Sequence, residues 1–135
     1  MERYLNKLYR IETTDEYFDE YLKGIGLNFF SRKLAKSFVS TSSISKLNDD
    51  YYAFTTTIPI KTHVQKFKIN EEIEQDTMDG RRVKNLFRIE GECLIEKQIE
   101  DIRKVTIIRE FRDTEMIAII KVNDICTIVK SVLIE

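Results

Sequence analysis

The chain has few of the residues that build reactive or cross-linked sites. Its 135 residues include no tryptophan, one proline, one histidine, two cysteines and four glycines. Cys93 and Cys126 cannot form a disulfide framework, and neither belongs to a Cys-x-x-Cys pair or to a Cys/His spacing that holds a metal. We therefore expect reduced thiols, no metal site and no cofactor.

Long hydrophobic runs and an excess of one charge are also missing. The longest unbroken apolar run covers residues 116–120, far below the roughly 20 residues that cross a bilayer. The N-terminus is charged from Glu2 onward and has no apolar segment of the kind that a signal peptide carries. With 22 basic and 23 acidic side chains, the chain has no overall field that gathers nucleic acid, so we expect no such partner.

Branched side chains dominate what is present. Nineteen Ile, seven Val and eleven Thr stand against three Ala, and branched residues suit strands better than helices. The single proline, Pro59, and the lack of a Gly/Ser/Pro-rich linker leave no boundary between domains. The length is that of one ordinary domain, so we expect a single, mostly β domain over residues 1–135.

Short branched or aromatic runs after residue 46 are separated by turn-like clusters at intervals of about ten residues, which is typical of consecutive antiparallel hairpins. Further strands near residues 8–13 and 38–46 bring the expected number to about ten. Strands at residues 54–58 and 93–99 mix polar groups into both faces. A packed sandwich core would leave such groups unpaired, at about 1 to 3 kcal/mol each. The pattern favours a water-containing barrel without by itself excluding a sandwich.

Helical signals lie between the first two strands. Residues 13–16 have the Ser/Thr-x-x-Glu form of a capping box, and apolar residues follow at i, i+3, i+4 and i+7 from Phe18. Gly24 is placed to end that helix. A second short helix is expected over residues 28–37, which makes a helical cap over about residues 15–37.

Several motifs in one order carry a family resemblance over nearly the whole chain, from about residue 7 to residue 130. They are Tyr9-Arg10-Ile11, Phe18-Asp19-Glu20-Tyr21-Leu22-Lys23, the segment Gly26 to Ala35, Asp79-Gly80-Arg81-Arg82-Val83-Lys84-Asn85 and Val105-Thr106-Ile107-Ile108-Arg109-Glu110-Phe111. At these positions the chain resembles the intracellular lipid-binding proteins, which include the cytosolic fatty acid-binding proteins.

The resemblance implies an all-β fold, a ten-stranded antiparallel up-and-down barrel (calycin-like β-clam) with a two-helix cap between the first two strands. It also implies non-covalent intracellular binding and transport of long-chain fatty acids or similar hydrophobic carboxylates in an internal cavity. We therefore expect a cytoplasmic carrier, monomeric and without enzymatic activity.

The last strand departs from the family pattern. Fatty acid-binding members usually read Cys-Thr-Arg-x-Tyr there, and that Arg and Tyr join an earlier Arg to hold the ligand carboxylate. This chain reads Cys126-Thr127-Ile128-Val129-Lys130. If Cys126 points inward as the resemblance implies, Ile128 and Lys130 do too, because alternate residues of a strand share a face. We expect Arg109 to bind the carboxylate, with Lys130 and Gln98 as further polar contacts.

The resemblance also places the cavity wall and its portal near the helical cap. The matching positions are Phe18, Tyr21, Leu22, Phe29, Ile60, Met78, Asp79, Arg81 and Ile128. Four basic residues of the cap predict transient contact with anionic membranes, at about 1 kcal/mol for each basic side chain near the surface; they are Lys23, Arg32, Lys33 and Lys36. Related members use the positions of Lys23, Arg32 and Lys33 as a nuclear-import patch, so a nuclear location is a further expectation.

Other functions remain open at this point. A retinoid or another neutral lipid would suit the missing Arg-x-Tyr, although Arg109 favours an acid. A hydrolase needs a nucleophile, a base and an oxyanion site, whereas the sole histidine, His63, lies beside a turn and neither cysteine has an activating neighbour in the sequence. A ligand-free interaction module would use only the barrel surface. Extraction of a lipid from the purified protein would distinguish these alternatives.

Overall fold

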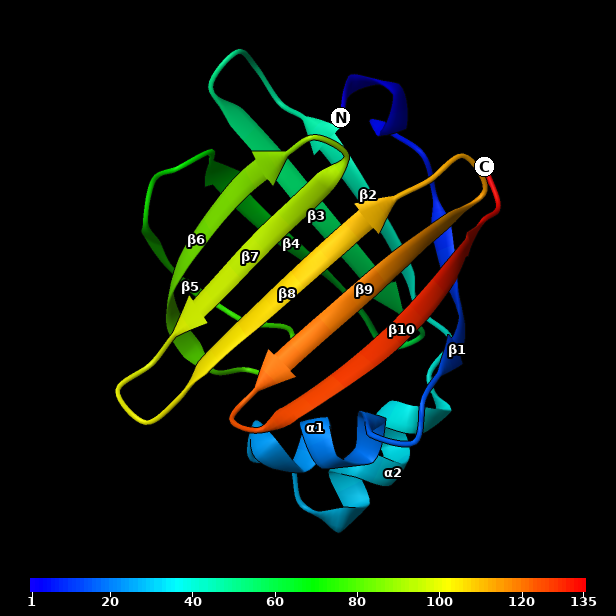
Figure 1. Cartoon of the computed structure of the whole chain (residues 1–135), viewed down its shortest axis with the longest axis vertical. Helices are drawn as coiled ribbons and strands as arrows, with labels where there is room; N and C mark the ends of the chain where they lie inside the picture. Colours follow the sequence, from blue (N-terminus) through cyan, green and yellow to red (C-terminus); the bar gives the residue numbers. More distant parts are fainter.

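The computed structural model describes residues 1–135 and contains one ten-stranded antiparallel sheet and two α-helices (Figure 1). In chain order the elements are a 3₁₀ turn Glu2–Tyr4, β1 Tyr9–Thr14, α1 Phe18–Gly24, α2 Phe29–Ser37, β2 Thr41–Lys46, β3 Tyr51–Ile58, β4 Lys61–Lys68, β5 Ile73–Asp76, β6 Arg82–Glu90, β7 Cys93–Ile99, β8 Lys104–Phe111, β9 Glu115–Val122 and β10 Ile125–Leu133. Neither α-helix has the length and apolar character that a membrane crossing requires.

The sheet curls into a nearly closed barrel, with strand order β4-β3-β2-β1-β10-β9-β8-β7-β6-β5. The first and last strands pair with each other, so the edges of the sheet are β4 and β5. Side chains bridge these two edges: Gln75 Nε2 donates to the Lys66 carbonyl at 3.1 Å, and His63 Nε2 lies 3.0 Å from the Asp76 carbonyl oxygen. The up-and-down barrel with a helical cap that the sequence predicts is confirmed.

Helices α1 and α2 cover one end of the barrel, and the N-terminus lies at the other end (Figure 1). Two buried hydrophobic clusters follow this division. The cluster at the N-terminal end contains Tyr4, Tyr9, Ile44, Phe54, Phe67, Phe87, Leu94, Phe111 and Met116. The cluster beneath α1 contains Leu22, Ile25, Val105, Ile107, Ala118, Ile120, Val122 and Val129. The buried polar residues Gln65, Asn85, Glu96, Gln98 and Arg109 belong to neither cluster.

Helix α1 begins at Phe18, two residues after the end of the predicted capping box. The box does not form, because Thr13 and Thr14 belong to β1 and pair with β10. Asp15 instead accepts hydrogen bonds from the Thr127 hydroxyl and from the Ile128 amide, the latter at 2.9 Å. The capping-box prediction is therefore wrong, because both threonines pair with β10. The Asp15 carboxylate that follows them binds the β1–α1 connection to β10.

The junction between the two helices follows the sequence more closely. Helix α1 ends at Gly24, and Gly26 then adopts a φ of +101°, a left-handed conformation that a side chain would strain. Helix α2 begins after Asn28, whose side chain accepts a hydrogen bond from the Ser31 amide at 2.9 Å. An asparagine N-cap of this kind satisfies one of the free amides of the first turn.

Candidate ligand-binding site

A cavity of about 490 Å³ lies inside the barrel and reaches the helical cap. Its wall is mostly apolar, and its volume falls in the range of small-molecule sites, about 300 to 1,000 Å³. The wall includes Phe18, Tyr21 and Leu22 from α1, Ile60, Met78, Asp79 and Arg81 from the neighbouring turns, and Gln65, Gln98 and Arg109 from the strands. A second recess of about 640 Å³ lies on the surface around Met1, Asp50 and Glu71, and it shares no wall residue with this cavity.

Two of the residues expected on this wall lie elsewhere. Phe29 is 73% exposed, with its ring 5.9 Å from the Arg32 guanidinium carbon on the outside of α2. Ile128 is 46% exposed on β10. The structure places both side chains outside the cavity.

A buried carboxylate, Glu96, is the centre of the polar groups at the inner end of the cavity. Arg109 Nη1 donates to Glu96 Oε1 at 2.8 Å. Three side-chain amides donate to Glu96 Oε2: Gln65 at 3.0 Å, Asn85 at 2.8 Å and Gln98 at 2.9 Å. Because β7 faces β8 with Glu96 opposite Ile107, the side chain of Arg109 is the diagonal neighbour of Glu96 on the inner face.

The surroundings of Glu96 keep it ionised. Burial alone would raise the pKa of this carboxyl, but the positive charge of Arg109 and the hydrogen bonds from Gln98, Asn85 and Arg109 outweigh burial and hold the pKa below its ordinary value. The Arg109 guanidinium carbon also lies 4.1 Å from the centroid of the Phe54 ring, a cation–π contact. The ion pair therefore places a positive charge, on Arg109, in the cavity wall and a negative charge, on Glu96, behind it.

A second charged cluster lies at the portal, around Arg81. Its guanidinium donates to Asp79 at 2.7 Å, to Glu100 at 2.9 Å and to the Gln98 side-chain carbonyl at 2.9 Å. Burial raises the pKa of Asp79, but hydrogen bonds from Arg81 and Thr77 outweigh it and lower that pKa overall. Gln98 thus joins the portal cluster to Glu96.

Arg103 extends the portal cluster to the helical cap. It lies 3.2 Å from Glu100 and donates to the Gly24 carbonyl, at the end of α1, at 2.9 Å. The four charges of this cluster, on Asp79, Arg81, Glu100 and Arg103, sum to zero. These contacts therefore connect three elements: the turn between β5 and β6, the turn between β7 and β8, and the end of α1.

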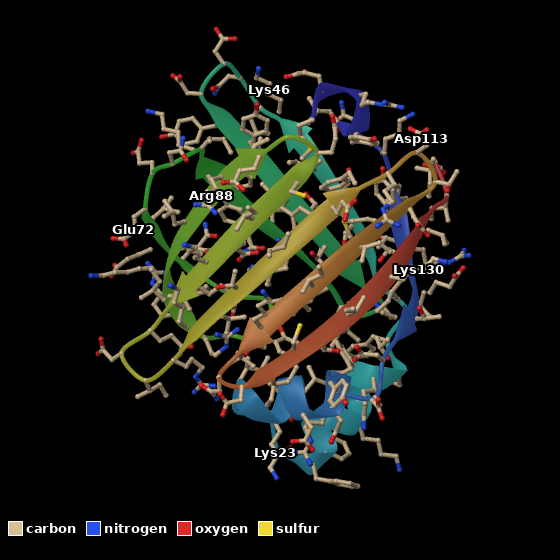
Figure 2. The ribbon with its side chains drawn as sticks, viewed as in Figure 1. Lys23, Lys46, Glu72, Arg88, Asp113 and Lys130 are labelled. Atoms are coloured by element: carbon tan, nitrogen blue, oxygen red, sulfur yellow. The ribbon has the colours of Figure 1, made fainter.

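The side chains of β10 that face the interior are the ones that the sequence analysis places on the outside. Thr127, Val129 and Ser131 are buried, whereas Lys130 points away from the barrel (Figure 2). Lys130 Nζ lies 3.5 Å from Glu12 and 3.3 Å from Glu115 on the outer surface. The prediction that Lys130 faces the cavity is wrong.

The strand register explains this reversal. Val129 pairs with Ala118 on β9, and Ala118 pairs with Arg109 on β8, so these three residues form one row on the inner face. An offset of one residue moves every side chain of a strand to the other face. The inward positions beside Arg109 therefore carry Val129 and Ser131 in place of a second arginine and a tyrosine.

The residues predicted from the sequence include Arg109 and Gln98 of this polar cluster but not Glu96, Asn85 or Gln65. The signal for Glu96 was present, because Glu96 and Gln98 stand two residues apart in one strand and therefore share a face. Asn85 and Gln65 come from β6 and β4, and only the closure of the barrel brings them to the same carboxylate.

The sequence pattern of the lipocalin / cytosolic fatty-acid binding protein family matches residues 7–131. The chain belongs to this family. A fatty acid-binding protein of Tyrophagus putrescentiae is 34% identical over 124 residues, which cover 92% of this chain and 93% of that protein. Sodium/calcium exchanger regulatory protein 1 of Doryteuthis pealeii is 34% identical over 115 residues, covering 84% of this chain and 86% of that protein.

A solved structure agrees with the family assignment. The fatty acid-binding protein from brain tissue of Drosophila melanogaster has a TM-score of 0.89 and 32% sequence identity, and the match covers 96% of this chain and 98% of that one. These relatives confirm the family resemblance and, because the family consists of lipid carriers, the expectation of a non-enzymatic protein.

Proposed function

We propose that this protein binds one long-chain fatty acid, or a similar hydrophobic carboxylic acid, in its internal cavity and carries it through the cytoplasm. The observation that carries the proposal is the cavity of about 490 Å³, with a mostly apolar wall and Arg109 at its inner end. Family membership supports it, since relatives such as the Tyrophagus protein are named fatty acid-binding proteins. The cytosolic character of the family supports the location.

Burial of the hydrocarbon chain supplies most of the affinity. About a dozen methylenes at ~0.8 kcal/mol each give ~10 kcal/mol before the costs of association, and ~8 kcal/mol corresponds to a micromolar dissociation constant. The head group then decides orientation and ligand class. A lipid can therefore still bind, although the site lacks the second arginine and the tyrosine that usually surround the head group.

A pair of substitutions on β3 tests whether the cavity holds the lipid. Thr56 is on the cavity wall, whereas the adjacent Thr57 is exposed on the other face of the strand. Thr56→Phe fills the cavity, so we expect weaker binding of oleic acid in calorimetric titration of the delipidated protein. Thr57→Phe makes the same change outside and should leave affinity unchanged. Equal affinities in the two variants would place the lipid elsewhere.

A second pair tests the role of Arg109. Arg109→Gln removes the charge at the inner end of the cavity and should weaken oleic acid binding by about tenfold, the equivalent of one charge-assisted hydrogen bond of about 1.5 kcal/mol. Lys130→Gln removes a charge from the outer face, where Lys130 pairs with Glu12 and Glu115, and should have no effect. Unchanged affinity in Arg109→Gln would remove Arg109 from the binding site.

Membrane contact through the helical cap is a second part of the proposal, and exposed aromatics on α2 favour it. Phe29 and Phe30 are 73% and 74% exposed beside the basic residues Lys33 and Lys36. Lys23 also points away from the barrel at this end (Figure 2). We expect transfer of a fluorescent fatty acid to vesicles to become faster as anionic lipid content rises. Transfer rates that ignore that content would contradict this part.

Two further properties are proposals of the same kind. A monomer is expected and can be checked by analytical ultracentrifugation. Nuclear import through Lys23, Arg32 and Lys33 can be checked by the location of a triple glutamine variant. In the free protein Arg32 already contacts Asp19 at 3.2 Å and donates to the Leu27 carbonyl at 2.9 Å, so an importing receptor would compete with these contacts.

A further inference from the structure

The protein itself supplies the counter-charge for Arg109. Glu96 is wholly buried and accepts four hydrogen bonds, one from Arg109 and three from amides on β4, β6 and β7. The other charged or titratable groups that act on this region are Arg81 and Asp79 from the turn between β5 and β6, and Tyr21 from α1. Burial raises the pKa of Tyr21 to about 12, so its hydroxyl stays neutral.

The other positive charges on the cavity wall are engaged at the portal. Arg81 lies between Asp79 and Glu100, and Lys61 donates to the Met78 carbonyl. An anionic head group at Arg109 would therefore stand beside the carboxylate of Glu96, with one guanidinium between two negative charges. Two carboxylates that share a site do not both ionise easily, and one of them is protonated at a raised pKa.

The remaining hydrogen-bonding groups point in the same direction. The side-chain amides of Gln65, Asn85 and Gln98 all donate to Glu96, and the Gln98 carbonyl oxygen accepts from Arg81. The wall therefore offers a ligand the other N–H groups of Arg109 as donors, the Gln65 carbonyl oxygen as an acceptor and the Ser131 hydroxyl, which can do both. A head group that both accepts and donates can use all three of these groups, whereas a carboxylate only accepts.

We propose that Glu96 is a specificity-determining residue that makes the inner end of the cavity select lipids with an uncharged head group able to donate and accept hydrogen bonds. Long-chain alcohols and amides meet this requirement directly. A fatty acid meets it by taking up one proton from solvent, so that the carboxylate and the proton become a bound carboxylic acid. The inference rests on the proposed function, because it assumes that the cavity binds a lipid.

Proton uptake has a measurable consequence. If one proton accompanies each fatty acid, the apparent affinity for the acid falls by about tenfold for each unit of pH above the pKa of the free acid, which is near that of a glutamate side chain, about 4.3. An amide or an alcohol of the same chain length has no such dependence. At neutral pH these neutral lipids should bind more tightly than the acid.

The experiment is calorimetric titration of the delipidated protein with oleic acid, oleamide and oleyl alcohol at about pH 7.5, in two buffers that differ in heat of ionisation. The wild type should take up close to one proton per oleic acid and none per oleamide. Glu96→Gln keeps the shape but removes the negative charge, so proton uptake should fall towards zero and oleic acid should bind at least about tenfold more tightly.

Glu110→Gln is the matched control, because Glu110 follows Arg109 on β8 but contacts Arg112 on the outer face at 3.2 Å. It should bind all three lipids as the wild type does. Oleic acid binding to the wild type without proton uptake would overturn the proposal, as would proton uptake that persists in Glu96→Gln. If Glu96→Gln does not fold, the number of protons that the wild type takes up per oleic acid tests the proposal by itself. Absence of binding heat for all three lipids would instead contradict the proposed function.

Discussion

Removal of the arginine from the buried ion pair should destabilise the protein strongly. In Arg109→Met, Glu96 stays wholly buried and keeps three amide donors but loses its only cation. Breaking a buried pair in this way costs about 3 to 5 kcal/mol. Because the three amides remain, we expect the lower end, about 3 kcal/mol of unfolding free energy near neutral pH.

The pH dependence of this loss has a definite sign. In the wild type the pKa of Glu96 lies below its ordinary value of 4.5, so its contribution to stability is full above that pH and is lost as pH falls through the folded-state value. Without Arg109, burial raises the pKa of Glu96 and the folded state favours the protonated form. The stability difference between the two proteins should therefore shrink as pH falls from the raised pKa of Glu96 in the variant, above 4.5, to its lowered pKa in the wild type.

Urea unfolding followed by circular dichroism measures this prediction. With a denaturant dependence of about 1 to 3 kcal/mol per molar urea, a loss of about 3 kcal/mol lowers the midpoint by about 1 to 3 M. The double variant Arg109→Met/Glu96→Gln should recover much of the loss, because no uncompensated charge is left. Arg112→Met, at an exposed pair, is the control with little change. A single variant as stable as this control, or a double variant no more stable than the single one, would contradict the reasoning.

Three more predictions follow from named contacts. Glu96→Gln should flatten the decline of stability in acid, because the wild type loses the contribution of the ionised Glu96 below its ordinary pKa of 4.5; pH-dependent unfolding curves that stay parallel would argue against it. Asp15→Ala should cost about 1 kcal/mol and speed hydrogen exchange at the Ile128 amide, which now donates to that carboxylate; unchanged exchange would contradict this contact. Arg103→Gln should loosen α1, because Arg103 donates to the Gly24 carbonyl; stopped-flow release of oleic acid should be faster, and an unchanged release rate would show that this tie does not gate the portal.

The architecture could be predicted because its signals are local and repeated. Branched residues, regular turn clusters and the glycine that ends α1, Gly24, all act within a few residues, and the family motifs confirm the same order. The one local error, the capping box at residues 13–16, arose because strand pairing with β10 takes Thr13 and Thr14. A hydrogen bond between distant strands thus overrides a local helix signal.

The polar site was harder to predict from the sequence because its geometry depends on the pairing register of the strands. A single-residue offset in β10 separates the expected inward set, Ile128 and Lys130, from the observed one, Val129 and Ser131. Glu96 was missed for a different reason. Its role arises from donors on β4, β6 and β8 that converge only when the barrel closes.

The head group of a bound fatty acid can be observed directly by NMR with oleic acid labelled with carbon-13 at its carboxyl. We predict one bound resonance per protein, at the chemical shift of a protonated carboxyl at about pH 7.5, which moves to that of a carboxylate in Glu96→Gln. Absence of a bound resonance would contradict lipid carriage in the cavity. A bound resonance with the shift of a free carboxylate in the wild type would contradict the role of Glu96 at its inner end.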